Sequence, residues 1–280
     1  MQASGPPMTE EEFLLLNEVI TTELGISFPE HKRDILASRL RPRLRELHLP
    51  RFFDYYLHLR SDIERERARL IELVTNNETY FFRETRQMDA LFGPALCELK
   101  ARTSVSGRLR LLCAGCSSGE EAYTLGLYAR QHAVDLAGTR LEIDAFDVDA
   151  SRLSQAQAAV YGPGSFRATS EEQRSRYFTP RGIERWALKP AYREGVRFFT
   201  ANIVELRSFA PAVAYDVLFC RNVLIYFSEP ALHSAVEHFA AVLRPGGLLF
   251  LGAAESIIGV SSRFETVRLG PVIAYRRVGK

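Results

Sequence analysis

The fold is decided by the stretch RLRLLCAGCSSGEEAYTLGLYARQ, residues 108–131, in which a turn with two glycines joins an apolar run of strand length to a helix-length segment. The same alternation continues toward the C-terminus. The predicted strands are 109–114, 141–146, 215–220 and 247–253, and the predicted helices are 120–131, 150–159 and 230–243. Near-continuous apolar strands separated by helices are typical of a parallel sheet covered on both faces. We therefore predict an α/β domain.

Three further features belong to this domain. The segment Arg244-Pro245-Gly246-Gly247 predicts a helix stop and a tight turn before a strand. Two strands joined at Gly270-Pro271 predict a hairpin at the sheet edge. Residues 162–195 break the alternation, because they are polar, rich in glycine and proline, and contain the one tryptophan. We interpret them as an insertion.

The first 75 residues predict a small helical domain. Thr9 and Glu12 have the spacing of a capping box, and Gly25 supplies a C-terminal stop for the helix between them. Pro42 lies inside the next predicted helix and should kink or restart it, because proline lacks an amide hydrogen and crowds the preceding turn. The predicted domains are 1–75 (helical), 76–88 (a linker that contributes to the site) and 89–280 (the α/β domain with its insertion).

Composition sets limits on function. The chain has 280 residues, of which 46% are hydrophobic and 25% charged, as in an ordinary globular protein. A formal net charge of +2 is too small to imply a nucleic-acid or membrane partner. No apolar stretch approaches the roughly 18 residues that a membrane span needs, and the N-terminus lacks the features of a secretory signal. Four irregularly spaced cysteines then indicate reduced thiols and a cytoplasmic location.

The turn after the first strand indicates what the sheet binds. An open parallel sheet binds ligands at the carboxyl ends of its strands, and Gly115 and Gly119 allow close backbone approach there. Glu120 and Glu121 follow at the start of the helix. Two carboxylates would repel a phosphate and attract an amino group or a sulfonium, which favours S-adenosylmethionine. Alternatively, both glutamates only stabilise the first helical turn through its dipole.

Acids at the end of the second strand support the first alternative. Asp147 comes directly after the apolar run, where a ribose diol is held in this architecture, whereas Asp149 is expected to cap the next helix.

Cys113 and Cys116 lack two further ligands at a suitable spacing, so we expect no metal site.

Four segments resemble the CheR-type chemotaxis receptor glutamate O-methyltransferases. These segments are NNETYFFRE (76–84), CAGCSSGEEAYTL (113–125), FDVD (146–149) and FCRNVLIYF (219–227). The resemblance covers nearly the whole chain, in order. It implies a Rossmann-like S-adenosylmethionine-dependent methyltransferase sheet with an N-terminal all-helical domain and a small β insertion.

The resemblance also implies the reaction and the residues that serve it. The enzyme would transfer a methyl group from S-adenosylmethionine to glutamate side chains on cytoplasmic chemoreceptor helices, leaving S-adenosylhomocysteine. Which of Glu120 and Glu121 makes the main cofactor contact stays open. The implied cofactor-binding residues are Asn77, Thr79, Arg83, Gly115, Gly119, Glu120, Glu121, Asp147, Asn202, Ile203, Arg221 and Asn222.

Arg83 and Tyr226 are implied to lie nearest the chemistry. A glutamate with a pKa near 4.3 is already ionised at neutral pH, so the site must orient this nucleophile and does not need a general base. The guanidinium of Arg83 can hold a carboxylate with two hydrogen bonds, and Tyr226 can contact the other oxygen or the sulfonium. Without the resemblance, a solvated Arg83 and a core Tyr226 would be the simpler interpretation.

A cationic segment gives the substrate a place to dock. Residues 30–51 have an excess of Lys and Arg, whereas residues 1–29 carry only acids. We assign Lys32, Arg33, Arg39 and Arg43 to docking of acidic receptor helices. The insertion contains a single glycine between 177 and 186, where some family members have a glycine-rich turn that grips a receptor pentapeptide, so we expect a pentapeptide-independent enzyme.

Two other function classes stay open. A methyltransferase that acts on RNA or on a small molecule would often carry an Asn/Asp-Pro-Pro-Phe/Tyr turn where this chain has Arg221-Asn222-Val223-Leu224. A non-catalytic scaffold would not need an intact Arg83. The sequence does not indicate an oligomeric state or which receptor is modified.

Overall fold

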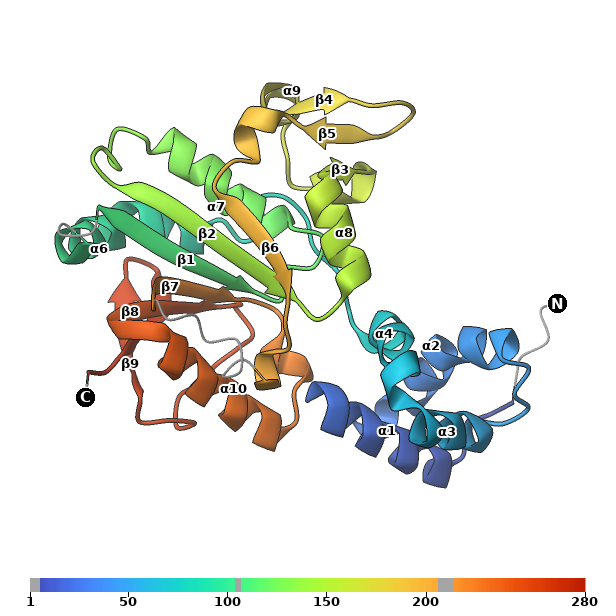
Figure 1. Ribbon diagram of the computed structural model, residues 1–280. Helices are drawn as coiled ribbons and strands as arrows, with labels where there is room; N and C mark the ends of the chain where they lie inside the picture. The colour runs from blue at the N-terminus through green and yellow to red at the C-terminus, as the bar shows by residue number, and fades with distance from the viewer. Residues whose placement is uncertain (1–5, 104–106, 206–213, 280) are drawn as a thin grey trace. The chain divides into compact units, whose positions relative to one another are not determined.

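The computed structural model describes residues 6–103, 107–205 and 214–279. The chain forms two compact units. The smaller unit contains Met1–Asn76 and Tyr226–Leu232, and the larger unit contains Asn77–Ile225 and His233–Lys280. Each unit is described by itself below (Figure 1).

Helices make up the smaller unit up to residue 76. They are α1 (Glu10–Leu24), the 3-10 helix η1 (Glu30–Lys32), α2 (Arg33–Glu46), α3 (Phe52–Ser61) and α4 (Ile63–Val74). The predicted capping box is confirmed, because the Thr9 hydroxyl accepts from the amide of Glu12 and the Glu12 carboxylate accepts from that of Thr9. Gly25 ends α1 with a left-handed φ of 74°.

Pro42 was expected to kink or restart its helix, and the restart is wrong. α2 runs without interruption from residue 33 to residue 46, with Pro42 inside it. Leu36, Leu40 and Leu44 recur at four-residue steps and are all buried. Burial of this apolar stripe stabilises helical backbone on both sides of the proline, which outweighs the one missing hydrogen bond.

A short segment from far along the chain joins the smaller unit. Ile26 and Phe227 form an isolated antiparallel bridge. The amide of Ser27 donates to the carbonyl of Tyr226 at 2.8 Å, and that of Ser228 donates to the carbonyl of Gly25 at 2.9 Å. Nothing in the sequence pattern indicates this pairing, because it joins residues about two hundred positions apart.

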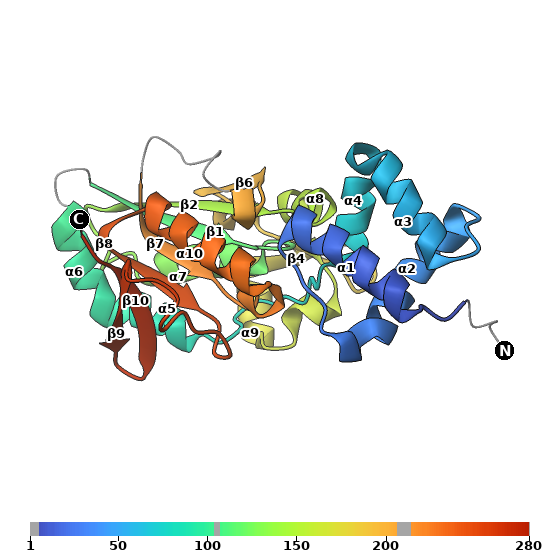
Figure 2. The ribbon, with the colours of Figure 1, turned by 90° about the horizontal axis from the view of Figure 1, so that it is seen from below.

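A seven-stranded sheet forms the centre of the larger unit, in the order β6-β2-β1-β7-β8-β10-β9. The strands are β1 (Arg108–Ala114), β2 (Arg140–Asp147), β6 (Val196–Thr200), β7 (Tyr215–Cys220), β8 (Leu243–Leu251), β9 (Phe264–Leu269) and β10 (Val272–Arg277). The strands from β6 to β8 are parallel, and β10 pairs antiparallel with β8 and β9. The predicted C-terminal hairpin is confirmed at the sheet edge (Figure 2).

Helices lie on both faces of this sheet, with α7 behind the strands and α10 in front of them in Figure 1. The helices are α5 (Arg86–Ala90), α6 (Leu96–Thr103), α7 (Glu120–Gln131), α8 (Ala150–Ala158) and α10 (Glu229–Val242). The π-turn η2 (Leu91–Ala95) links α5 to α6 and contains Gly93 and Pro94. The helices between residues 86 and 103 were not predicted, because this pair interrupts the helical period.

The turn predicted at Arg244–Gly247 takes a different form. α10 does end before it, at Val242, but β8 begins at once with Leu243. Leu243 pairs with Tyr215, and the next pair is Val217 with Leu248, so the intervening residues bulge out of the strand. Gly246 permits this bulge with a φ of 76°.

The insertion forms a second, three-stranded antiparallel sheet in the order β3-β5-β4. Its elements are β3 (Val160–Tyr161), η3 (Pro163–Phe166), α9 (Glu171–Tyr177), β4 (Phe178–Pro180), β5 (Trp186–Leu188) and η4 (Pro190–Tyr192). Among all described residues, no helix combines the length and the apolar character needed to cross a membrane.

Candidate functional site

The turn after β1 depends on two glycines for conformation and for packing. Gly115 and Gly119 have left-handed φ angles of 72° and 88°. A Cβ atom on Gly115 would lie 2.6 Å from Cγ2 of Val223, and one on Gly119 would lie 2.8 Å from the Cβ of Ala156. Only glycine both adopts these φ angles without strain and leaves room for these close neighbours, so the local fold requires glycine at both positions whichever ligand binds there.

Asp147 ends β2 with a buried carboxylate that contacts this turn. Its Oδ2 accepts a hydrogen bond from the amide of Ser117 at 2.7 Å, and its Oδ1 accepts one from the amide of Asp149 at 2.9 Å. Burial raises the pKa of the Asp147 carboxyl, although both amide bonds favour the ionised form. Each oxygen has about two lone-pair sites, so each can accept one further hydrogen bond.

The two glutamates at the start of α7 lie in different surroundings. Glu120 is only 1% exposed, and its oxygens accept hydrogen bonds from the hydroxyls of Ser118 and Ser165, both at 2.8 Å. Burial raises the pKa of Glu120. Glu121 keeps a side chain that is 16% exposed, and one of its oxygens lies 2.9 Å from the guanidinium of Arg221. Only Glu121 therefore borders open space.

Arg221, directly after β7, has a side chain that is 1% exposed. Its guanidinium nitrogens lie 2.9 Å from Glu121 and 3.5 Å from Glu84, and one of them donates to the carbonyl of Arg83 at 2.8 Å. A buried cation is stable only with such partners. Arg221 thus joins three segments that carry predicted site residues.

The backbone around Arg83 is strained. Phe82 and Glu84, on either side, have left-handed φ angles of 60° and 48°. Such angles cost about 1–3 kcal/mol each outside glycine, and they cluster at functional sites. Nη1 of Arg83 donates to the carbonyl of Glu78 at 2.8 Å, whereas its buried Nε has no hydrogen-bond partner among the described residues. The strained residues therefore hold a guanidinium whose buried Nε lies 3.8 Å from a carboxylate oxygen of Glu84.

Phe81 anchors this strained segment in aromatic residues on both sides of Gly162. Its ring centroid lies 4.8 Å from those of Tyr161 and Phe178, and 5.7 Å from that of Phe166. Its amide donates to the carbonyl of Ser165 at 2.9 Å. A role of the insertion in holding Arg83 was not predicted. The doublet Phe81-Phe82 was the available signal, because two adjacent aromatics usually have a core to enter.

Asn77 links the same segment to the ends of β1 and β2. Its Nδ2 donates to Oδ2 of Asp149 at 2.9 Å, and its carbonyl accepts from the Ser117 hydroxyl at 3.2 Å. Asp149 also caps α8, which confirms that prediction. Thr79 is half-buried.

Asn202 and Ile203 follow β6 and are mostly buried, with exposures of 8% and 6%. The carbonyl of Ile203 lies 2.9 Å from Nδ1 of His238 on α10. Sequence analysis missed His238, because a histidine within an apolar helix carries no positional signal. It also missed Glu255, whose carboxylate accepts hydrogen bonds from the amide of Asn222 and from its two successors.

Tyr226 belongs to the smaller unit, whereas Arg83 belongs to the larger one. The Tyr226 hydroxyl accepts a hydrogen bond from Nδ2 of Asn76. The catalytic pairing of Arg83 with Tyr226 therefore stays a prediction.

Two of the four predicted docking cations have partners within the smaller unit, and their role in docking stays a prediction. Arg39 donates to the carbonyls of Val74 and Thr75 at the C-terminus of α4. Arg43 binds buried Glu66 through two hydrogen bonds of 2.7 and 2.6 Å, which raise its pKa. Both cations satisfy groups that the helix packing would otherwise bury unpaired.

Lys32 and Arg33 differ from those two arginines. Within the described part of the chain, their side chains form no ion pair or hydrogen bond, and both are partly exposed. They stay available to a partner.

The four cysteines are free thiols, and Cys113 and Cys116 are buried. Burial raises the pKa of both thiols well above the ordinary value, so neither is a reactive thiolate. No group of three or more His, Cys, Asp or Glu residues that could hold a metal occurs among the described residues.

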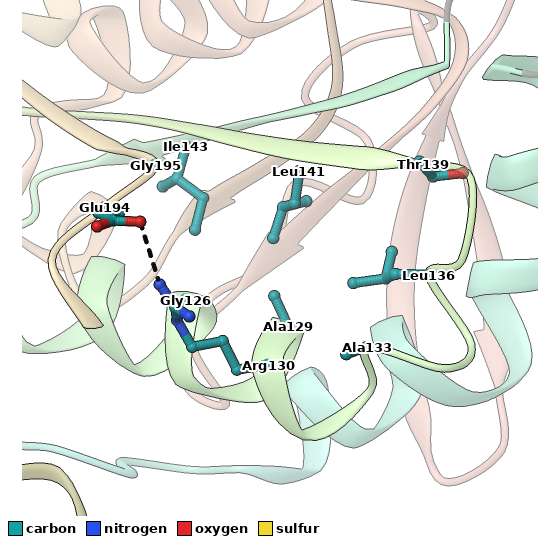
Figure 3. A pocket seen from close by; sticks show the side chains of 10 residues that line it. All are labelled: Gly126, Ala129, Arg130, Ala133, Leu136, Thr139, Leu141, Ile143, Glu194 and Gly195. Carbon is teal, nitrogen blue, oxygen red and sulfur yellow. Dashed lines mark ion pairs between the residues drawn. The ribbon is translucent and has the colours of Figure 1, made fainter. Parts of the chain in front are cut away.

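A groove of about 270 Å³ lies between α7 and the first half of β2 (Figure 3). Small and apolar side chains line it, and Arg130 and Glu194, 3.8 Å apart, form an ion pair at its rim. No predicted site residue lines it. The groove exists because α7 presents Gly126 and Ala129 to the sheet, with Ala133 just beyond the end of the helix, which leaves space against Leu141 and Ile143.

The chain is similar to known proteins over nearly its whole length. Residues 77–273 match the family described as CheR methyltransferase, SAM binding domain, and residues 11–75 match CheR methyltransferase, all-alpha domain. The chain is 32% identical to chemotaxis protein methyltransferase 2 of Vibrio cholerae, over 98% of this chain and 95% of that protein. It is 32% identical to chemotaxis protein methyltransferase 1 of Pseudomonas aeruginosa, over 95% and 97% of the two chains. A chemotaxis protein methyltransferase of Listeria monocytogenes is 31% identical over 90% of this chain and 92% of its own.

Proposed function

We propose that this chain, which belongs to the CheR methyltransferase family, holds S-adenosylmethionine at the carboxyl ends of β1, β2 and β7 through the residues described above. The activity follows from membership of the family. The chain is an S-adenosylmethionine-dependent methyltransferase that esterifies glutamate side chains of chemoreceptors in chemotaxis. When bound, the cofactor supplies a methyl group on a positively charged sulfur.

The observation that carries this site is the contact between Asp147 and the amide of Ser117. It fixes the carboxylate beside the glycine turn and leaves one acceptor site on each oxygen, which suits the two hydroxyls of a ribose. Asn202 and Ile203 follow the neighbouring strand β6 and would border the adenine.

Glu121 would contact the amino group of the cofactor. Its carboxylate is the partly exposed one of the pair, and Arg221 holds one of its oxygens. Glu120 instead serves the packing between the turn and Ser165. This assignment selects one of two residues that the sequence leaves equivalent.

Arg83 would orient the substrate carboxylate. An ionised glutamate needs no general base, so the contribution of the site is position, with reacting atoms about 3–3.5 Å apart. The strained angles beside Arg83 and its partly exposed side chain support this role. Tyr226, whose hydroxyl accepts from Asn76, would complete the catalytic pair with its hydroxyl or its ring.

Receptor docking would use the free cations of the smaller unit. Lys32 and Arg33 remain candidates for direct contact, whereas Arg39 and Arg43 would contribute by stabilising the helices that carry this surface.

We also propose that the enzyme acts without a receptor pentapeptide, because the turn between β4 and β5 has Gly182 as its single glycine. The partner is then the receptor helix alone, with no nucleic acid, and the location is cytoplasmic.

We place the domain limits near residues 75 and 88, as the sequence predicts.

One assay tests the reaction and separates it from its alternatives. The protein is incubated with radiolabelled S-adenosylmethionine and receptor-containing membranes, and the product is treated with base. Glutamyl methyl esters release volatile labelled methanol, whereas N-methyl groups do not. Base-stable label would contradict the glutamate assignment, and bound cofactor without label would favour a scaffold.

A matched pair of variants completes this assay. Arg83→Gln should reduce turnover by about a hundredfold, because orientation of the nucleophile is lost. Arg86→Gln changes an exposed arginine three residues away and should leave turnover unchanged. Equal activity of the two variants would remove Arg83 from the catalytic site.

A further inference from the structure

A single carboxylate, that of Glu255, gathers four main-chain amides at the carboxyl edge of the sheet. Its Oε1 accepts from Val223 at 2.8 Å and from Leu224 at 2.7 Å. Its Oε2 accepts from Asn222 and from Gly252, both at 2.7 Å. A carboxylate has about four lone-pair sites, so Glu255 has none left for a ligand.

The three consecutive amides need an anion because of the local backbone. Asn222 has a left-handed φ of 60°, so the amides of residues 222–224 converge and do not enter a strand or a helix ladder. Converging amides of this kind form a concave anion site, which in other proteins often binds a phosphate. In this chain, a side chain from the loop after β8 supplies the anion.

The segment is also held from its other side. The turn after β1 approaches so closely that a Cβ atom on Gly115 would meet Val223 at 2.6 Å. A Cβ atom on Gly252 would lie 2.8 Å from Oε2 of Glu255 and 2.9 Å from Nδ2 of Asn222. Residues 222–224 therefore lie between the loops that follow β1 and β8, in close contact with one glycine of each loop.

We propose that Glu255 is a positioning residue for the methyl-transfer reaction. It fixes the segment that carries Arg221 and Asn222, and through Arg221 it fixes Glu121 and the strained residues around Arg83. Glu255 would act without contact to either substrate, because four amides occupy its carboxylate. The inference rests on the proposed function, because Arg221 holds Glu121, which is assigned there to the amino group of the cofactor.

Glu255→Gln is the decisive variant. It keeps the shape of the side chain but places an NH2 group, which cannot accept, against two of the four amides. We expect the amides of residues 222–224 to exchange hydrogen at least about tenfold faster, because their hydrogen bonds to a charged acceptor are lost or weakened. S-adenosylhomocysteine should bind about tenfold more weakly in calorimetry, and kcat/KM for the cofactor should fall equally. The KM for the receptor should stay within about twofold of wild type.

Two further variants separate positioning from general stability. Glu237→Gln removes a surface carboxylate that pairs with Arg263 and Ser261, and it should behave as wild type. Gly252→Ala disturbs the same carboxylate from the opposite side while leaving Glu255 in place, and it should reproduce the loss of cofactor affinity. Exchange of the β1 amides at residues 109–114 should be unchanged in all three variants.

The outcomes are distinct. Unchanged exchange at 222–224 and unchanged affinity in Glu255→Gln would overturn the inference, as would equally faster exchange throughout the sheet with normal affinity. If wild-type protein itself fails to bind S-adenosylhomocysteine, the proposed function is wrong. If wild type binds and Glu255→Gln matches Glu237→Gln, only the inference is wrong.

Discussion

The turns after β1 and after β7 are each held by a buried or partly buried carboxylate that accepts hydrogen bonds from backbone amides, but the two carboxylates accept different numbers of them. Each contains a non-glycine residue with a left-handed backbone, Ser117 with φ 49° and Asn222 with φ 60°. Asp147 accepts one amide on each oxygen, whereas Glu255 accepts two on each. The first carboxylate can still receive a ligand and the second cannot.

This difference teaches how to separate a binding carboxylate from a supporting one. Residue type, charge and a position after a strand are shared by both acids. The number of acceptor sites already in use is not shared, and it decides whether a hydroxyl of the cofactor can be bound. Variants of the individual acids test that distinction, starting with Asp147, which has one unused acceptor site on each oxygen.

The largest effect is expected for Asp147→Asn. The variant replaces one acceptor oxygen with a donor and removes the charge, so at least one of two charge-assisted hydrogen bonds to the ribose is lost. Affinity for S-adenosylhomocysteine should fall about a hundredfold, corresponding to about 2.7 kcal/mol. Titration calorimetry measures it, with Asp135→Asn as a control at an exposed carboxylate that contacts His132. Unchanged affinity would show that Asp147 is only structural.

The pH dependence of binding should follow Asp147 in wild type. Burial raises the carboxyl pKa above 3.8, and only the ionised form can accept a hydrogen bond on each remaining site. Affinity should therefore be constant at neutral pH and should fall as pH drops through the raised pKa, by about tenfold per unit below it. The Asp147→Asn variant should lose this dependence. The same slope in both proteins would assign the titration to another group.

A smaller effect is expected for Glu121→Gln. The partly exposed carboxylate loses its charge toward the amino group of the cofactor and its ion pair with Arg221. Affinity should fall about tenfold, in keeping with one charge-assisted contact. The measurement is again calorimetry. A larger loss than that of Asp147→Asn would reverse the order of the two acids.

The smallest effect on binding, within about threefold, is expected for the neighbouring Glu120→Gln. Both serine hydroxyls can rotate to donate or accept, so the amide keeps both hydrogen bonds. Burial raises the pKa of Glu120 above 4.5, so the folded state binds this proton more tightly than the unfolded state. Wild-type stability therefore falls as pH rises from 4.5 through the raised value.

Glu120→Gln has no such proton, so its free energy of unfolding relative to wild type should increase across this interval. Urea denaturation at several pH values measures the difference. A variant that loses stability relative to wild type as pH rises would contradict the buried environment of Glu120.

Local sequence determined the elements of the α/β unit. The helix predicted at 120–131 and the strand predicted at 215–220 match α7 and β7, because each pattern concerns residues close in sequence whose burial follows a single period. The cap at Asp149 has the same local origin. The helices between residues 86 and 103 lacked such a period, since Gly93 and Pro94 interrupt it.

The sequence by itself also determined the chemical character of the site: acids, glycines and one arginine at the ends of consecutive strands, in an order that resembles a known family. Only the tertiary structure decided which of these groups are free. It leaves Glu121 partly exposed while Glu120 is buried. It pairs Arg43 with Glu66, and it places the Glu255 carboxylate against amides some thirty residues away in the chain. The physical reason is that a hydrogen-bonding group has a fixed capacity, and how much of it the chain itself uses depends on neighbours that sequence proximity does not reveal.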